Sequence, residues 1–215
     1  MLYAYPSSVR MLLGLSVATY DQGAMEQGKK LLLEACDLNP ADPTPYLFLG
    51  KLQEAEKSEP PGWPERFARF VRLHPENPLA HYYYALALGK QPDNANATAI
   101  ESELKKAIEL DPQRGGAYLE LGILYSQRKD YPEAISAFQK AIELSPLPAE
   151  AHYRLGQVYG HMGEAENASQ EIELFKQISE QKKNEAERER HKIQQFVYTL
   201  RSQSSSSPSP TSKPH

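Results

Sequence analysis

Apolar and small residues recur along this chain at spacings of three and four, which predicts a succession of amphipathic helices. The pattern is clearest between Tyr118 and Pro146, where a break at residues 128–130 separates two apolar stripes. Gly122 and Ala134 are small at the positions where two antiparallel helices would cross most closely, and larger apolar residues flank both. This segment therefore predicts a hairpin of two antiparallel helices.

The hairpin pattern repeats along the chain. The prolines that close successive stretches stand 34, 35, 37 and 34 residues apart, at Pro6, Pro40, Pro75, Pro112 and Pro146. A period near 34 is typical of helical solenoids, in which each unit buries its apolar face only by stacking on its neighbours. The sequence therefore predicts an all-α solenoid with a long surface that is free to bind.

The clearest unit also has the residue types of a known family. Its characteristic positions are Tyr118, Leu121, Gly122, Tyr125, Ala134, Phe138, Ala141 and Pro146. In type and spacing these residues resemble the tetratricopeptide repeat (TPR). The resemblance extends to five repeats with a C-terminal helix and implies a right-handed α-solenoid of antiparallel helix hairpins, a TPR-like superhelix. The chain departs from the family pattern at Gln53, Tyr84 and Glu180, where the family usually has an aromatic residue, leucine and proline.

Counting outward from this unit predicts the domain boundaries. A remnant of a preceding repeat at 1–8 is followed by five repeats, at 9–42, 43–77, 78–114, 115–148 and 149–182. The middle repeats are longer because of extended turns near residues 59–62 and 89–93, which are either tolerated insertions or recognition loops. Residues 183–201 form a C-terminal capping or extended helix, and residues 202–215 a disordered tail rich in Ser and Pro.

Two alternatives remain open for the C-terminal helix. It either runs on from the fifth repeat or breaks near Asn184 and folds back. Its apolar stripe either caps the solenoid, which is the interpretation we prefer, or binds a partner or a second copy. The stripe consists of Ile193, Phe196, Val197 and Leu200.

Composition narrows the class of function. The chain has 215 residues, of which 40% are hydrophobic and 24% charged, and this is the ordinary globular range. A net charge of -4 and a pI near 5.9 give no basic footprint for nucleic acid. No apolar run is long enough to span a membrane. The segment from Arg10 to Ala18 imitates a short signal peptide but fits the repeat register, so no signal peptide is predicted; location is cytoplasmic by default unless an upstream segment is missing.

No motif for catalysis, cofactor binding or metal binding is found. The residues from Gly14 to Ala18 only faintly match a nucleophile elbow, which needs a final glycine and a strand-to-helix turn. His81 and His152 occupy the packing position of Tyr118, so we expect both to be core histidines. No two histidines stand at i and i+4. We therefore expect no enzyme activity, no cofactor, and no catalytic or metal-binding residue.

The family resemblance also implies where a partner would bind. In TPR proteins the first helix of each hairpin lines the concave side, and the residues beside the Leu-Gly pair point into the groove. On this sequence the predicted partner-binding groove consists of Val17, Tyr20, Phe48, Lys51, Tyr82, Tyr83, Leu86, Glu120, Ile123, Tyr153, Arg154 and Gln157. The residues at one register have the alternative role of packing adjacent hairpins together: Leu13, Leu47, Tyr82, Leu119 and Tyr153. Phe48 and Tyr83 are expected to be exposed aromatic anchors.

The predicted function is a non-catalytic protein interaction scaffold. It would bind a peptide or protein segment in the apolar and aromatic groove, with Lys51, Glu120 and Arg154 setting the orientation. Leu13 and Val17 stand where a clamp for a chain-terminal carboxylate needs Lys and Asn, which disfavours that type of receptor. The alternative is an assembly module that associates with upstream repeats or self-associates, as a homo-oligomer, through its uncovered ends.

Overall fold

A computed structural model describes residues 8–55, 62–90, 96–145 and 148–205, with the backbone alone for Ala55, Ile193 and residues 196–205. These described residues form ten helices and no strand, which confirms the predicted all-α class. The chain divides into two compact units, residues 1–146 and residues 147–215. Each unit is described by itself.

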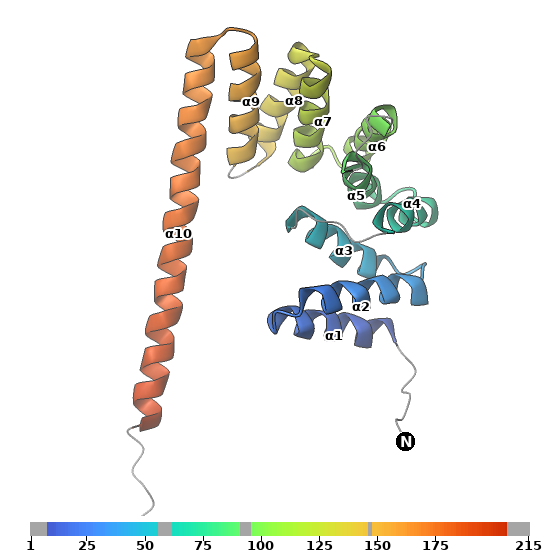
Figure 1. Ribbon diagram of the computed structural model, residues 1–215, viewed down its shortest axis with the longest axis vertical. Coiled ribbons are helices and arrows are strands. Elements are labelled where there is room, and N and C mark those ends of the chain that lie inside the picture. The colour runs from blue at the N-terminus through green and yellow to red at the C-terminus, as the bar shows by residue number, and fades with distance from the viewer. Residues whose placement is uncertain (1–7, 56–61, 91–95, 146–147, 206–215) are drawn as a thin grey trace, which may run out of the picture. The chain divides into compact units, whose positions relative to one another are not determined.

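The first unit is a stack of helix hairpins. Its helices are α1 (Val9–Asp21), α2 (Met25–Leu38), α3 (Pro43–Ala55), α4 (Trp63–Leu73), α5 (Pro78–Gly89), α6 (Ala97–Leu110), α7 (Gly115–Arg128) and α8 (Tyr131–Leu144). Each odd-numbered helix packs against the helix that follows it, and α2, α4 and α6 each also contact the first helix of the next hairpin. The helices α3 and α5 contact each other directly and lie on one side of the unit, with α4 and α6 on the other (Figure 1).

Local sequence signals set the helix ends. Ser8 accepts a hydrogen bond from the Met11 amide at the start of α1, and Asn77 accepts one from the Leu79 amide at the start of α5. The short turns between paired helices use a left-handed residue, which satisfies the last carbonyls of the preceding helix. These residues are Gly23, Lys129 and Gly163, with φ of 79°, 66° and 80°.

Aromatic rings form the centre of the first unit. Tyr46 stacks on Phe70 with the ring centroids 4.7 Å apart, and Phe67 lies between Trp63 and Tyr83 at 6.2 Å and 5.9 Å. All five side chains are buried. Four of these residues belong to the second repeat, and the contact of Phe67 with Tyr83 joins it to the third. Burying each large apolar side chain contributes about 1.5–3 kcal/mol to stability.

Glycines allow the closest approaches between helices. A Cβ atom placed on Gly122 would lie 2.5 Å from the ring of Phe138, which confirms the predicted crossing in the fourth repeat. A Cβ atom on Gly50 would lie 2.2 Å from the ring of Tyr83. The absence of a side chain at each position therefore makes room for an aromatic ring of the neighbouring helix.

The second unit consists of α9 (Ala149–His161) and α10 (Ala165–Ser205), packed side by side (Figure 1). The ring centroids of Tyr153 and Phe175 are 5.2 Å apart, and Ile172 packs on Gly156. At 1.5 Å per residue α10 is about 60 Å long and α9 about 20 Å, so α9 covers only the first part of α10.

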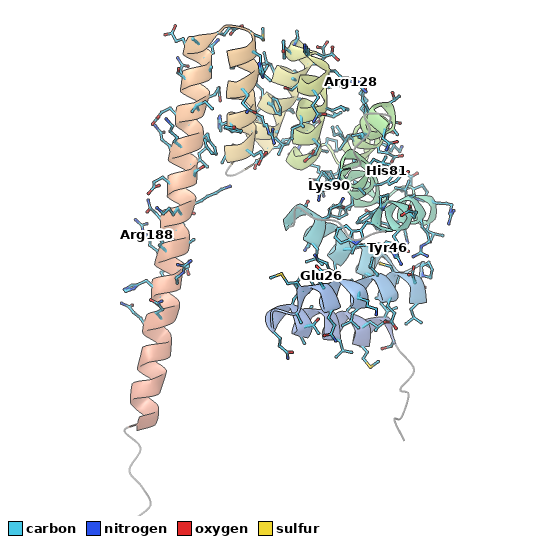
Figure 2. All side chains as sticks on the ribbon, viewed as in Figure 1. Glu26, Tyr46, His81, Lys90, Arg128 and Arg188 are labelled. Atoms are coloured by element: carbon cyan, nitrogen blue, oxygen red, sulfur yellow. The ribbon has the colours of Figure 1, made fainter. Side chains whose placement is uncertain are left out.

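The remainder of α10 is a solvated helix. Every residue from 180 to 192 is exposed, and Arg188 projects beyond the end of α9 (Figure 2). Contacts one turn apart support this stretch, such as Gln181 with Glu185 and Glu189 with Lys192. Of the two alternatives for the C-terminal helix, the structure shows the continuous one, with no break at Asn184.

Several predictions fall partly or wholly outside the described residues. The helix α10 continues to Ser205, four residues into the tail predicted at 202–215, and residues 206–215 are outside the described range. Residues 1–7 of the remnant predicted at 1–8 are also outside it, as are residues 59–61 and 91–93 of the turns predicted at 59–62 and 89–93. So are the side chains of the predicted apolar stripe, Ile193, Phe196, Val197 and Leu200.

Candidate functional site

A pocket of about 180 Å³ lies among α5, α6 and α7. It brings together three residues of the predicted groove, Leu86 from α5 with Glu120 and Ile123 from α7, and all three are half-buried. Most other lining residues are apolar or small: Ala85, Leu88, Gly89, Ala97, Ile100, Leu104 and Leu124. The helices of two successive repeats thus build one apolar hollow.

Two further polar residues of this pocket are Lys90, directly after α5, and Gln127 of α7. Lys90 and Gln127 are exposed and contribute to the lining. Lys90, which directly follows α5 (Figure 2), donates a hydrogen bond from Nζ to the main-chain oxygen of Gln53, at 3.2 Å. Because Gln53 lies in the last turn of α3, this cation also offsets the negative end of the α3 dipole. Lys90 therefore connects the pocket to the second repeat.

The two tyrosines predicted for the groove are buried, with exposed fractions of 6% for Tyr82 and 3% for Tyr83. The expectation that Tyr83 is an exposed anchor was wrong, because its ring fills the space above Gly50 between α3 and α5. Burial raises the pKa of Tyr83 to about 12 and the pKa of Tyr82 further still. Both hydroxyls stay protonated at neutral pH, and both rings serve the packing of hairpins.

A charged cluster surrounds Tyr82. The guanidinium of Arg114 lies 5.8 Å from the centroid of its ring, a cation–π contact. Glu54 of α3 accepts a hydrogen bond from Tyr82, and partial burial nevertheless raises the pKa of the Glu54 carboxyl above its usual range. Glu120 contributes a second negative charge near the same ring. This cluster joins α3, α5 and the start of α7 beside the pocket.

The face of α3 supplies the exposed aromatic group. Phe48 is 41% exposed and Lys51 is exposed one turn further along the helix. Leu47 is half-buried and packs against the core of the unit, the alternative role foreseen for its register. Leu13 likewise packs against that core, while Leu119 is half-buried. Phe48 therefore has the accessible aromatic surface that Tyr83 lacks.

The remaining groove predictions lie at the ends of the chain. In α1, Val17 is 47% exposed, whereas Tyr20 is half-buried with its ring over Gly28. In the second unit, Gln157 donates a hydrogen bond to the Tyr153 hydroxyl, and Arg154 pairs with Glu150. These residues of α9 bond locally, one turn apart.

Sequence reasoning missed Glu54, Lys90 and Arg114. Each stands at or just beyond a helix end, outside the positions beside the Leu-Gly pair from which the groove was assigned. The signal for Lys90 is a cation directly after α5, placed where it meets the carbonyl end of α3. No comparable signal marks Glu54, since its environment depends on the neighbouring repeat.

The histidines and the cysteine that could take part in chemistry elsewhere in the chain are buried in the core. His81 and His152 are buried and lie 2.6 Å from Glu103 and Glu171, in agreement with the prediction of core histidines. Cys36 is buried, and burial raises the pKa of its thiol to about 12. Within the described ranges, no cluster of His, Cys, Asp and Glu could hold a metal ion, and no helix has the length and apolar character to cross a membrane.

The tetratricopeptide repeat matches this chain at four places. The matched segments are residues 65–115, 103–136, 124–163 and 149–182, which together extend from 65 to 182 and exceed half of the 215 residues. No curated protein sequence matches significantly.

Solved structures share the fold at low identity. TTC0263, a thermophilic TPR protein of Thermus thermophilus, has a TM-score of 0.61 and 19% identity over 80% of this chain and 98% of its own. MamA of Desulfovibrio magneticus RS-1 has a TM-score of 0.59 and 20% identity over 80% of this chain and 96% of its own. YrrB, a TPR protein described as having an unusual peptide-binding site, has a TM-score of 0.54 and 19% identity over 80% of this chain and 86% of its own. The chain belongs to the tetratricopeptide repeat family, whose members are generally non-catalytic scaffolds for protein interaction.

Proposed function

We propose that this protein binds an extended or helical segment of another protein on the face formed by α3, α5 and α7. The observation that carries the proposal is the apolar pocket among α5, α6 and α7, with Leu86 and Ile123 in its wall. Its volume of about 180 Å³ accommodates one side chain of the size of leucine or phenylalanine. Burying such a side chain contributes about 1.5–3 kcal/mol, which is the range of an interface anchor.

Phe48 provides a second contact for the segment. Its ring is 41% exposed on α3, the helix that packs directly on α5. An exposed aromatic side chain loses little conformational entropy on binding, and such rings are enriched among binding anchors. The segment would therefore place one apolar side chain in the pocket and a second one against Phe48.

Charged groups near the pocket would orient the segment. Glu120 lines the pocket itself, and Lys51 follows Phe48 by one turn. Lys90 already donates to the Gln53 oxygen, so its role is to position the wall of the pocket. Because polar groups at the rim set specificity more than affinity, we assign orientation to Glu120 and Lys51.

We propose that the second unit contributes less to ligand binding than the first. Tyr153, Arg154 and Gln157 satisfy one another's or neighbouring polar groups within α9, which leaves them less to offer a ligand. The peptide-binding site named for YrrB gives a precedent within the fold, but its 19% identity carries no residue assignment.

A random peptide library displayed on phage tests the proposal. Selection on the full-length chain is expected to enrich peptides that share one bulky apolar residue. A synthetic peptide of the enriched sequence, titrated by fluorescence anisotropy, should bind the Ile123→Gln variant at least about tenfold more weakly.

The matched control is Ile135→Gln, because Ile135 is also half-buried but lies on α8 outside the pocket. This variant should bind the peptide as the unchanged protein does, and circular dichroism should show equal helicity for both variants. Equal binding by the Ile123→Gln variant would contradict the proposal.

A further inference from the structure

Among the described residues, the first helix of the first unit is covered on one side only. Leu12 and Ser16 of α1 are buried, and α2 is the helix against which α1 packs. On the opposite side Met11, Leu15 and Val17 are 39%, 47% and 47% exposed, and Gly14 and Ala18 are exposed among them. Met11 and Leu15 lie on one side of Gly14 around the helix and Val17 lies on the other, so apolar side chains flank the centre of the exposed surface, as is typical of a contact surface.

Gly14 differs from the glycines inside the other helices. A Cβ atom on Gly28, Gly50, Gly122 or Gly156 would lie 3.0 Å or less from a side chain of another residue, whereas a Cβ atom on Gly14 would meet no atom of another helix within 4 Å. Gly160 is similarly open, but it stands in the last turn of α9. Glycine lowers helix propensity, and a second surface that approaches α1 closely at this point would offset that cost.

The charged residues of this face are complementary to those on the same face of a second copy. Arg10, Gly14, Val17 and Asp21 lie on one stripe, at i, i+4, i+7 and i+11, and all four are exposed. Neither Arg10 nor Asp21 has an ion-pair partner among the described residues. If two such helices pair antiparallel around the centre of the stripe, Arg10 meets Asp21 of the second copy and Gly14 meets Val17. A parallel pairing would oppose like charges.

We propose that the exposed face of α1 is a homodimer interface, in which two copies of this chain pair antiparallel through Met11, Gly14, Val17 and Ala18. A twofold contact uses the same patch on both copies and so requires self-complementarity, which the stripe has in charge and in size. Gly14 allows the two backbones to approach, and the ion pairs at each end fix the direction. The dimer leaves the pocket on α5, α6 and α7 to another partner.

Sedimentation velocity of the full 215-residue chain over a wide range of protein concentration tests the dimer. The expected result is a monomer–dimer equilibrium. Arg10→Glu and Asp21→Lys each replace two attractive pairs by two repulsive ones and should each weaken the dimer about tenfold at low salt. The double variant restores opposite charges and should return the dimer to near its original strength.

Gly14→Gln separates dimerisation from folding. The new side chain meets open space within one chain, so helix propensity should raise the midpoint of thermal unfolding. The same side chain holds two copies apart, so the dimer should weaken more than tenfold.

Two results would overturn the proposal. One is a chain that stays monomeric at every concentration, the behaviour expected if residues 1–7 or a different protein cover this face. The other is a dimer that these substitutions leave unchanged.

Discussion

The third and fifth repeats contain the same buried contact in different surroundings. In both, a histidine of the first helix lies 2.6 Å from a glutamate of the second, His81 with Glu103 and His152 with Glu171. The third repeat continues into α7, and three helices then enclose the pocket. In the fifth repeat the second helix extends as α10, exposed from residue 180 to 192. The hairpin is thus common to both repeats, and the pocket forms where the third and fourth hairpins meet.

The largest expected effect on stability distinguishes a buried aromatic residue of α5 from an exposed aromatic residue of α3. Tyr83→Ala should lower the free energy of unfolding of the first unit by about 3–5 kcal/mol, because the ring fills the space on Gly50. Phe48→Ala should cost less than about 1 kcal/mol, since Phe48 is 41% exposed. Urea unfolding followed by the fluorescence of Trp63, the one tryptophan and a core residue, measures both. Similar losses for the two variants would refute the assignment.

The histidine pairs themselves provide the next comparison. His81 also donates from Nε2 to the main-chain oxygen of Pro75, at 2.8 Å. His81→Phe removes both polar contacts of the ring, with that oxygen and with the Glu103 carboxylate, and should cost about 3 kcal/mol. His152→Phe removes the contact with the Glu171 carboxylate and should cost about 1.5 kcal/mol. Thermal and urea unfolding by circular dichroism compare the two, and a larger loss for His152→Phe would contradict the expected order.

An ion-pair network between repeats should make stability depend on pH. Hydrogen bonds from Lys105 and Arg128 lower the pKa of Glu101 from 4.5 to about 2 and tie α6 to α7. A depressed pKa adds stability that is present above the unfolded value and is lost as pH falls through the folded one. Glu101→Gln should therefore cost about 1–2 kcal/mol at neutral pH, with the difference from the unchanged protein disappearing between about pH 4.5 and pH 2.

The control for this network is Glu173→Gln in α10, whose carboxylate and the partner Lys176 are both largely exposed. That substitution should have almost no effect on stability at any pH. A loss at Glu101 that stays constant from neutral to acid pH would argue against the ion pairs as its cause.

The smallest expected effect concerns the hairpin turns. Lys129 adopts a left-handed φ of 66° in the fourth repeat, at the place that Gly163 occupies in the fifth with φ of 80°. Lys129→Gly should raise stability by about 0.5–1 kcal/mol, because the side chain disfavours this conformation. Gly163→Lys should lower it by a similar amount. Thermal melts of the two variants should shift in opposite directions.

The hairpins could be predicted because their pattern is local. Gly122 and Phe138 belong to one hairpin, and the spacing alone implied their contact. Tyr83 could not be placed in this way, since its ring packs on Gly50 of the preceding repeat. The position beside a Leu-Gly pair indicates which side of the helix a residue occupies, but the neighbouring repeat decides whether that side is covered.

The same distinction explains the C-terminal helix and the pocket. The absence of Gly and Pro left two alternatives, a helix that runs on and one that breaks near Asn184, and the structure shows a continuous α10 that ends at Ser205, four residues into the segment predicted as a tail. Leu86, Glu120 and Ile123 were assigned to the groove from their register, and they do line one pocket. Lys90 was missed because its contact with the Gln53 oxygen joins residues 37 apart in the chain.

Methyl NMR of the full-length chain with labelled isoleucine, titrated with the peptide selected on phage, tests the central claim most directly. Ile100 and Ile123 line the pocket, and Ile172 packs on Gly156 in the second unit, so each region has its own reporter. We expect the methyl signals of Ile100 and Ile123 to shift in proportion to peptide bound, while the signal of Ile172 stays in place. A shift at Ile172 with both pocket signals unchanged would contradict a binding site formed where the third and fourth repeats meet.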